Sequence, residues 1–152
     1  MKSISYTLAF TFVAAVSFIF LFLAIAMVPY WQGLSGFEIQ AWWSGPFTNF
    51  SIVMVPIHLL SLATIFFGFF NHIKGEKAHK FLWIMALLGL LICQIFNFTL
   101  FGVNLNPALQ SGSLSETEAL FIFDDWQWYH NIRTASVCAS LLALIVIGSA
   151  RK

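Results

Sequence analysis

The sequence predicts an all-α integral membrane protein: a four-transmembrane-helix up-down bundle whose last helix extends beyond the outer face. Two observations carry this prediction. Of the 152 residues, 60% are hydrophobic and only 9% are charged, whereas a soluble domain carries about 25% charged residues. The apolar residues also gather into long runs separated by short polar segments, and the mean hydropathy is +0.87. The chain has too little charge to cover a surface that faces water.

Each apolar run is long enough to cross a bilayer as a helix. Crossing about 30 Å of hydrocarbon takes roughly 20 apolar residues. The runs cover approximately residues 4–28, 50–70, 81–103 and 134–150. Short connections and the lack of an internal repeat predict one integral membrane domain, residues 1–152, in which neighbouring helices are antiparallel.

The first run also shares features with a secretory signal peptide. Lys2 precedes the apolar stretch, and Ala24-Ile25-Ala26 resembles a small-residue cleavage site. A signal peptide, however, has an apolar core of roughly 7–15 residues, and this run continues without a break to Pro29. We therefore expect a retained helix.

The distribution of charge predicts the orientation of the bundle. Basic residues lie at the start of the chain, between the second and third runs, and at the end: Lys2, Lys74, Lys77, Lys80, Arg151 and Lys152. Five of the six acidic residues lie in the other two connections: Glu38, Glu116, Glu118, Asp124 and Asp125. Because short loops rich in Lys and Arg stay in the cytoplasm, we expect both termini there. The 1–2 and 3–4 loops then lie outside the cell or inner membrane, and Arg133 is the only cation on that side.

The last helix is expected to be longer than the membrane is thick. Ser115 and Glu118 fit a capping box, in which each side chain bonds the backbone N–H of the other residue. No proline or glycine follows until Gly148, so the sequence predicts a helix from about 116 to 149, near 50 Å long at 1.5 Å per residue. Its first part, 116–133, forms an amphipathic extension.

Four side chains share one face of this helix. Trp126, Tyr129, His130 and Arg133 are spaced at i, i+3, i+4 and i+7, which places them on the same side. Trp128 points elsewhere. The stripe therefore predicts a polar and aromatic surface at the outer rim of the bundle.

Strongly polar residues of the other spans fall at a similar depth. His58 lies about 10 Å below the outer end of the second span at 1.5 Å per residue, two residues after Pro56, which can kink the helix there. Because lipid cannot satisfy such groups, they normally face the bundle interior. We expect a site in which His58, His130 and Arg133 are catalytic. The expected substrate-binding residues are Gln94, Asn97, Asn104, Asn106, Trp126 and Tyr129.

Structural roles are the competing interpretation. A single His or Asn between membrane helices often only links them, contributing about 1 kcal/mol. Tryptophans at a membrane boundary usually form an interfacial belt, and Trp31, Trp42 and Trp43 fit that pattern.

A haem or copper site at His58 and His130 is an open alternative, although no third ligand lies at the same depth. His72 and His79 flank the cytoplasmic loop, on the wrong side of the membrane. Cys93 and Cys138 lack metal-ligand spacing, so we expect buried free thiols. We expect no metal and no cofactor, and the lack of a basic stripe excludes nucleic acid as a partner.

Three segments resemble the anthrone oxygenase-like family of small four-span membrane proteins. They are NLNPALQ (Asn104–Gln110), WQWYHNIR (Trp126–Arg133) and the stretch from Pro29 to Trp43. The resemblance implies oxidation of an anthrone to an anthraquinone by molecular oxygen without a cofactor. The family's functional positions correspond here to Trp126, His130 and Arg133, and to Asn104 or Asn106. The asparagines depart from the family pattern, because they stand three and one residues before Pro107.

One interpretation of the sequence is an oxygenase or oxidoreductase that takes a planar or lipophilic, often aromatic, small molecule at an outer-leaflet polar pocket. His130 or His58 would act as general base and Arg133 would stabilise an oxyanion. The alternatives are a non-enzymatic small membrane subunit that binds a lipid, a quinone or a partner protein, and the haem- or metal-binding bundle. Besides the lipid bilayer, a second copy of the chain is an expected partner. Transport is disfavoured, because the inner halves of the spans lack polar residues.

Overall fold

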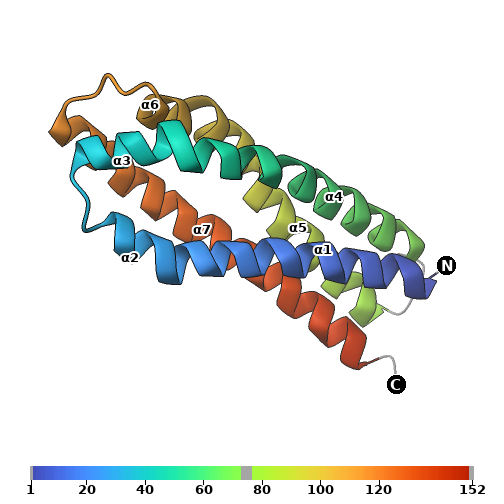
Figure 1. Cartoon of the computed structure of the whole chain (residues 1–152). Coiled ribbons are helices and arrows are strands. Elements are labelled where there is room, and N and C mark those ends of the chain that lie inside the picture. The colour runs from blue at the N-terminus through green and yellow to red at the C-terminus, as the bar shows by residue number, and fades with distance from the viewer. Residues whose placement is uncertain (1, 73–76, 151–152) are drawn as a thin grey trace.

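Four long apolar helices run side by side through the molecule (Figure 1). This computed structural model describes residues 2–72 and 77–150. Within them, the helices long and apolar enough to cross a membrane are Ile4–Trp31, Gly36–His72, His79–Gln110 and Glu116–Ser149. The all-α four-helix prediction is confirmed, and the chain is a multi-pass integral membrane protein. Lys74, Arg151 and Lys152, which contribute to the predicted orientation, lie outside the described residues.

The long helices are divided into shorter elements by π-helical turns. The first consists of α1 (Lys2–Phe22), η1 (Leu23–Met27) and α2 (Val28–Trp31). The second consists of α3 (Gly36–Trp42), η2 (Trp43–Phe47) and α4 (Thr48–His72). The third consists of α5 (Lys77–Phe96), η3 (Asn97–Leu105) and α6 (Asn106–Gln110). The fourth, α7 (Glu116–Ser149), is an uninterrupted α-helix.

A proline accompanies each π-helical turn. Pro29 follows η1, Pro46 lies within η2, and Pro107 follows η3. Proline has no N–H, and its ring clashes with the carbonyl four residues earlier, so a wider turn lets the helix continue past it. Our expectation that the first helix ends at Pro29 was therefore wrong, and residues 36–49, which fall in the expected 1–2 loop, are helical. All three turns lie toward the end of the bundle that carries α3, hereafter the α3 end; the opposite end, where α1 begins and α7 ends, is the terminal end (Figure 1).

Two capping boxes start helices at the α3 end. The Ser115 hydroxyl accepts from the Glu118 backbone N–H, and the Glu118 carboxylate accepts from the Ser115 backbone N–H at 2.9 Å. Ser35 and Glu38 repeat this arrangement at the start of α3. The predicted capping box and the predicted helix over 116–149 are both confirmed.

Glu116 ties α3 to α7. Its carboxylate accepts from the backbone N–H of Gly36 at 2.7 Å and of Phe37 at 3.1 Å. These N–H groups belong to the first turn of α3 and have no acceptor within their own helix. A Cβ on Gly36 would overlap the backbone oxygen of Glu116, so glycine is required for this close approach.

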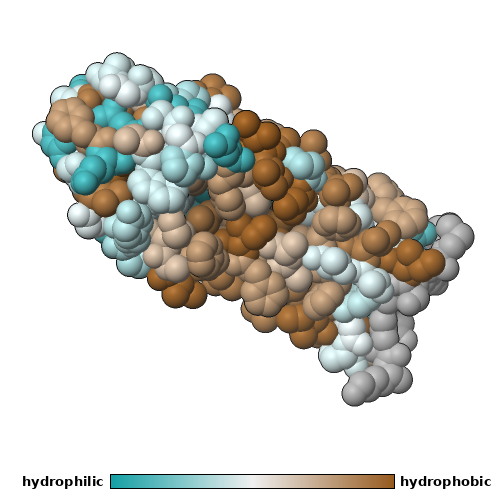
Figure 2. Space-filling model, viewed as in Figure 1, coloured by the Kyte–Doolittle hydropathy of each residue, from teal (hydrophilic) through white to brown (hydrophobic). Residues whose placement is uncertain are grey.

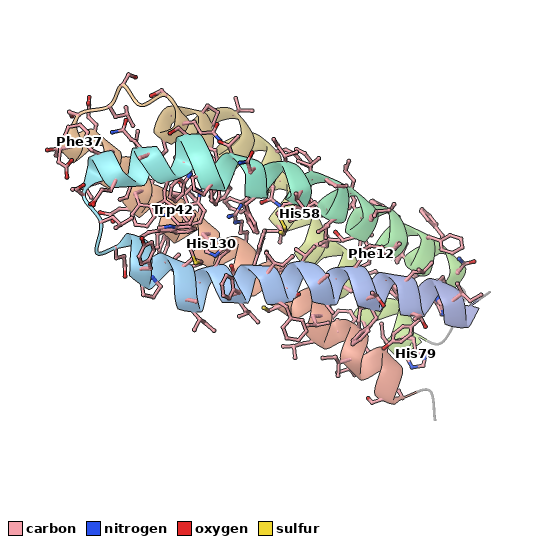
Figure 3. All side chains as sticks on the ribbon, in the orientation of Figure 1. Phe12, Phe37, Trp42, His58, His79 and His130 are labelled. Atoms are coloured by element: carbon pink, nitrogen blue, oxygen red, sulfur yellow. The ribbon has the colours of Figure 1, made fainter. Side chains whose placement is uncertain are left out.

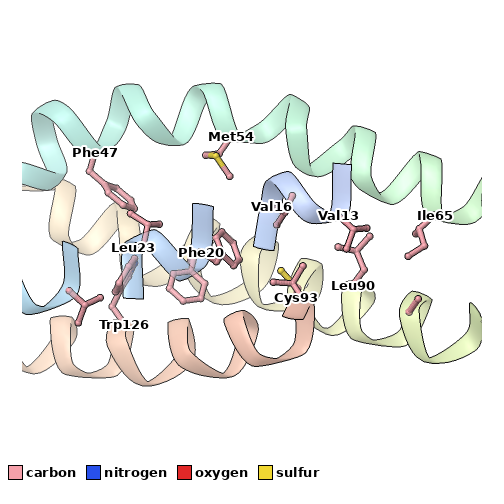
Figure 4. Close-up of a cluster of buried hydrophobic side chains, with 14 of the residues drawn as sticks. Val13, Val16, Phe20, Leu23, Phe47, Met54, Ile65, Leu90, Cys93 and Trp126 are labelled. Carbon is pink, nitrogen blue, oxygen red and sulfur yellow. The ribbon is translucent and has the colours of Figure 1, made fainter. Parts of the chain in front are cut away.

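The helices pack as a ring around an apolar core. α1 lies against α4 and α7, and α5 lies against α4 and α7. Val13, Ile65 and Leu90 fill the interior toward the terminal end, while Phe47 and Trp126 fill it toward the α3 end (Figure 4). The core therefore continues through the length of the bundle.

The surface has two zones. Large apolar side chains cover the body, and Ile25, Phe18 and Ile52 are 73%, 67% and 65% exposed. Hydrophilic side chains gather at the α3 end (Figure 2). An apolar surface of this extent is typical of a lipid-facing protein.

Gly89 provides a test of the close contact between α5 and α7. A Cβ on Gly89 would lie 2.5 Å from the backbone oxygen of Ser136, and overpacking of this kind costs about 1–3 kcal/mol. We expect Gly89→Ala to lower the Tm of the purified protein. Gly45→Ala is the control, because its Cβ would meet nothing within 4 Å. Equal melting of the two variants would contradict the packing.

Candidate functional site

Polar side chains from α4, α5 and η3 form a hydrogen-bonded cluster inside the bundle. The side-chain nitrogen of Gln94 lies 3.0 Å from Nδ1 of His58, and that of Asn97 lies 3.3 Å from the same atom. The Asn97 nitrogen also donates to the Gln94 oxygen at 3.4 Å. Figure 3 places His58 near the middle of the bundle and His130 toward the α3 end from it, with His79 at the terminal end.

Arg133 connects this cluster to α7. Its Nη1 donates to Oδ1 of Asn97 at 2.7 Å. Its Nε and Nη2 lie 3.1 and 2.9 Å from Nδ1 of His130. One network therefore joins α4, α5, η3 and α7 around Arg133.

The direction of these hydrogen bonds assigns the His58 tautomer. A guanidinium group only donates, so the oxygen of Asn97 faces Arg133 and its NH2 group faces His58 and Gln94. The oxygen of Gln94 accepts from Asn97, which turns the NH2 group of Gln94 toward His58 as well. Because the Gln94 amide makes the shorter contact, to Nδ1 at 3.0 Å, while the Asn97 nitrogen lies 3.3 Å from Nδ1 and 3.5 Å from Nε2, the proton of the neutral His58 imidazole is assigned to Nε2. His58 can therefore offer a ligand an N–H at Nε2.

His130 lies behind Arg133. Its ring stacks on Trp126, with ring centres 4.9 Å apart and planes 15° apart, and its side chain is fully buried. Nδ1 accepts from Arg133, and the backbone oxygen accepts from the Thr134 hydroxyl at 2.7 Å. His130 thus holds the guanidinium in place.

Asn106 accepts a hydrogen bond from the indole of Trp126, whose ring stacks on His130. Its Oδ1 accepts from Nε1 of Trp126 at 3.0 Å and from Nε1 of Trp43 at 3.2 Å. Trp31 packs edge-on against both indoles. Because Trp31 and Trp43 are 1% and 0% exposed, they belong to the core rather than to an interfacial belt.

Arg133 is a buried cation without a carboxylate partner among residues 2–72 and 77–150. Its side chain is 5% exposed, and its guanidinium carbon lies 3.6 Å from the ring centre of Phe101 and 4.5 Å from that of Phe20. Arginine has five N–H donors; the three hydrogen bonds above go to an amide and an imidazole, which leaves two N–H groups without a partner among the described residues. Cation–π contacts compensate only part of the lost hydration.

A pocket of about 270 Å³ lies beside this network. Its polar side chains are His58, Gln94, Asn97, Asn106, Gln110, Arg133 and Ser51. Its aromatic side chains are Phe20, Phe47, Phe50, Phe98 and Phe101. Ile52 and Val55 of α4, 65% and 49% exposed, lie on its rim. The pocket therefore extends from the buried network to the apolar surface between α4 and η3.

The structure brings most of the predicted site residues together. His58, Gln94, Asn97, Asn106 and Arg133 line the pocket, and His130 and Trp126 contact Arg133 from behind.

Two predicted residues lie apart from this group. Tyr129 packs against Phe96, with ring centres 5.7 Å apart. Asn104 is exposed and donates to the backbone oxygen of Thr99 at 3.3 Å. Neither side chain joins the network.

The aromatic residues that surround Arg133 were not predicted. Phe20 and Phe101 are two of 18 phenylalanines in the chain, and no local pattern distinguishes them from the others. Gln110, which donates to the Thr48 hydroxyl at 3.0 Å, was not selected either. Its position at the end of the NLNPALQ segment was the one available signal.

The histidines are not arranged as a metal-binding pair. Among the described residues, no group of three or more His, Cys, Asp or Glu side chains has the geometry to hold a metal ion. The ring of Phe20 lies 5.3 Å from that of His58 and 5.5 Å from that of His130. A haem held by both histidines would need the space that Phe20 fills.

Comparison with protein families, characterised proteins and solved structures found no match to this chain. The resemblance to the anthrone oxygenase-like family therefore stays a prediction.

Asn97 offers a test of the network. Asn97→Leu keeps the size of the side chain but removes the acceptor for Arg133 and the donor to His58, which leaves buried polar groups unpaired at about 1–3 kcal/mol. We expect a lower Tm than that of the wild type. Asn104→Leu, an exposed substitution in the same segment, is the control and should melt like the wild type. If the two variants melt together, the network does not contribute to stability.

Proposed function

We propose that this protein binds a lipophilic small molecule in the pocket between α4 and η3. The observation that carries the proposal is the composition of the pocket wall. Hydrogen-bond donors from Arg133 and His58 lie at its buried side, and Val55 and Phe98, each 49% exposed, lie at its lipid-facing side. A ligand with a polar group and an apolar body matches this gradient.

We propose that the pocket lies in the outer half of the membrane. α1 begins and α7 ends at the same end of the bundle (Figure 1), as four antiparallel spans require. Lys80 begins the third apolar run near that end, while Asp124 and Asp125 lie on the half of α7 toward the α3 end. The positive-inside rule then places the terminal end in the cytoplasm and the α3 end outside.

Blocking the rim tests ligand entry. Val55→Trp adds a large ring to the pocket rim, whereas Leu59→Trp adds the same ring one turn further along α4, at a 51% exposed residue outside the pocket lining. Overpacking at the rim costs about 1–3 kcal/mol, so we expect Val55→Trp to weaken ligand binding by roughly tenfold or more. The measurement is fluorescence of 1-aminoanthracene, a flat lipophilic probe, in phosphatidylcholine nanodiscs.

The matched variant decides the outcome. Leu59→Trp should bind the probe like the wild type. If both tryptophan variants retain full binding, or both lose it equally, the probe is not held in this pocket.

Oxidation of a phenol-type substrate is a second candidate function. An uncompensated cation beside the pocket would stabilise a phenolate oxygen, and His58 is the one pocket-lining side chain of the described residues with an imidazole that can exchange a proton. Molecular oxygen would convert an activated CH2 group of the bound substrate to a carbonyl. One oxygen atom enters the product, and the other leaves as water with the two hydrogens.

An isotope experiment tests this second candidate. Incubation with anthrone under ¹⁸O₂ should give a quinone with one labelled carbonyl oxygen, detected by mass spectrometry. Loss of the oxyanion-stabilising group costs roughly a hundredfold in rate, so Arg133→Gln should fall by about that factor, while Asn104→Leu should not change. A rate equal to that of protein-free nanodiscs would rule out this activity.

A further inference from the structure

We infer that the pocket binds a lipophilic oxyanion: a carboxylate or phosphate group on a hydrocarbon body, taken up from the lipid phase. This inference rests on the proposed ligand-binding function and adds the charge of the ligand and its route of entry.

The negative charge of the ligand is inferred from Arg133. It is a 5% exposed cation that lines the pocket, and its three hydrogen bonds go to neutral partners. An ionised side chain inside a membrane protein is normally paired, because burial of an isolated charge is costly. The counter-ion of Arg133 is therefore an anion that reaches it through the pocket.

The pocket wall is built to donate hydrogen bonds. Two N–H groups of Arg133 have no partner in the described part of the chain, and His58, which also lines the pocket, has an N–H at Nε2 in the assigned tautomer. No carboxylate lies among the lining residues. An oxygen with several lone pairs and a negative charge accepts from such donors better than a neutral carbonyl does, because hydrogen bonds to charged groups are stronger.

The acidic residues of the α3 end are bound elsewhere. Glu116 accepts from the first turn of α3, and Glu38 and Glu118 accept within their capping boxes. Asp124 and Asp125 are exposed. The carboxylates of the described residues therefore lie away from Arg133.

The same acids indicate the route of entry. An end of the molecule with acidic side chains repels anions from the adjacent water. The rim of the pocket, by contrast, includes the apolar side chains of Ile52, Val55 and Phe98. An amphiphile dissolved in the bilayer meets this rim directly, with its hydrocarbon part remaining in the lipid between α4 and η3.

A series of ligands with one hydrocarbon chain tests the charge. Dodecanoate, dodecyl phosphate, dodecanol and dodecylamine are titrated separately into the protein in phosphatidylcholine nanodiscs, and binding is measured from the rise in Tm that a native-state ligand causes. We expect both anions to bind at least tenfold more tightly than the alcohol, and the amine to bind least.

An isosteric variant tests whether Arg133 is the anchor. Asn97→Asp places a carboxylate at the atom that accepts from Nη1 of Arg133 at 2.7 Å, and so supplies the missing counter-ion from the chain itself. We expect this variant, which also removes the Asn97 donors to His58 and Gln94, to lose the preference for anions. Asn104→Asp is the matched control, because Asn104 is exposed in the same segment, and it should keep the preference.

The outcomes separate the inference from the proposed function. If dodecanol binds as tightly as dodecanoate and Val55→Trp abolishes both, the pocket binds lipophiles but the oxyanion inference is overturned. If no ligand in the series binds, or Val55→Trp has no effect on any of them, both fail. If phosphatidylglycerol in the nanodisc competes with dodecanoate in the wild type but not in Asn97→Asp, the inference holds and the anion is a lipid headgroup. If it does not compete, the anion is a free single-chain acid.

Discussion

The buried polar network depends on a charged guanidinium that has no carboxylate beside it in the described part of the chain. Arg133 is held from one side by Asn97 and from the other by His130, and the rings of Phe101 and Phe20 lie against it. These contacts come from α1, η3 and α7. Because none of them carries a negative charge, the free energy of burying Arg133 is only partly compensated. A protein that retains such a group gives up stability that an apolar residue would provide, which is a common cost of a binding site.

The backbone supplies the room for this site. Prolines at 29, 46 and 107 accompany π-helical turns, and π-helical turns are frequent at functional sites. η3 carries Asn97 and Phe101 to the pocket, and η2 carries Phe47. Toward the terminal end, where the helices are regular, apolar side chains fill the interior. The pocket is therefore placed where the helical hydrogen-bond pattern widens.

The residues of the network have two different roles: some hold Arg133 in place, and others line the pocket. His130 and Trp126 support Arg133 from behind, whereas His58 and Asn97 line the pocket with it. In the assigned tautomer His58 donates at Nε2, so binding an acceptor oxygen needs no proton transfer. Oxidation of a phenol would require His58 to take up a proton in addition. Ligand binding therefore requires fewer steps from these residues than catalysis, which would need proton transfer in addition to binding.

The sequence by itself determined the membrane class, the approximate spans, the capping box at Ser115 and the continuous helix over 116–149. These are local properties, because apolar length, caps and the spacing of Trp126, His130 and Arg133 are read within one segment. The tertiary structure alone decided which polar residues meet. It left Tyr129 and Asn104 outside the network, turned Trp31 and Trp43 into the core, and placed Phe20 and Phe101 against Arg133. The rotation of each helix about its axis is set by packing against helices distant in sequence, and no local pattern contains that information.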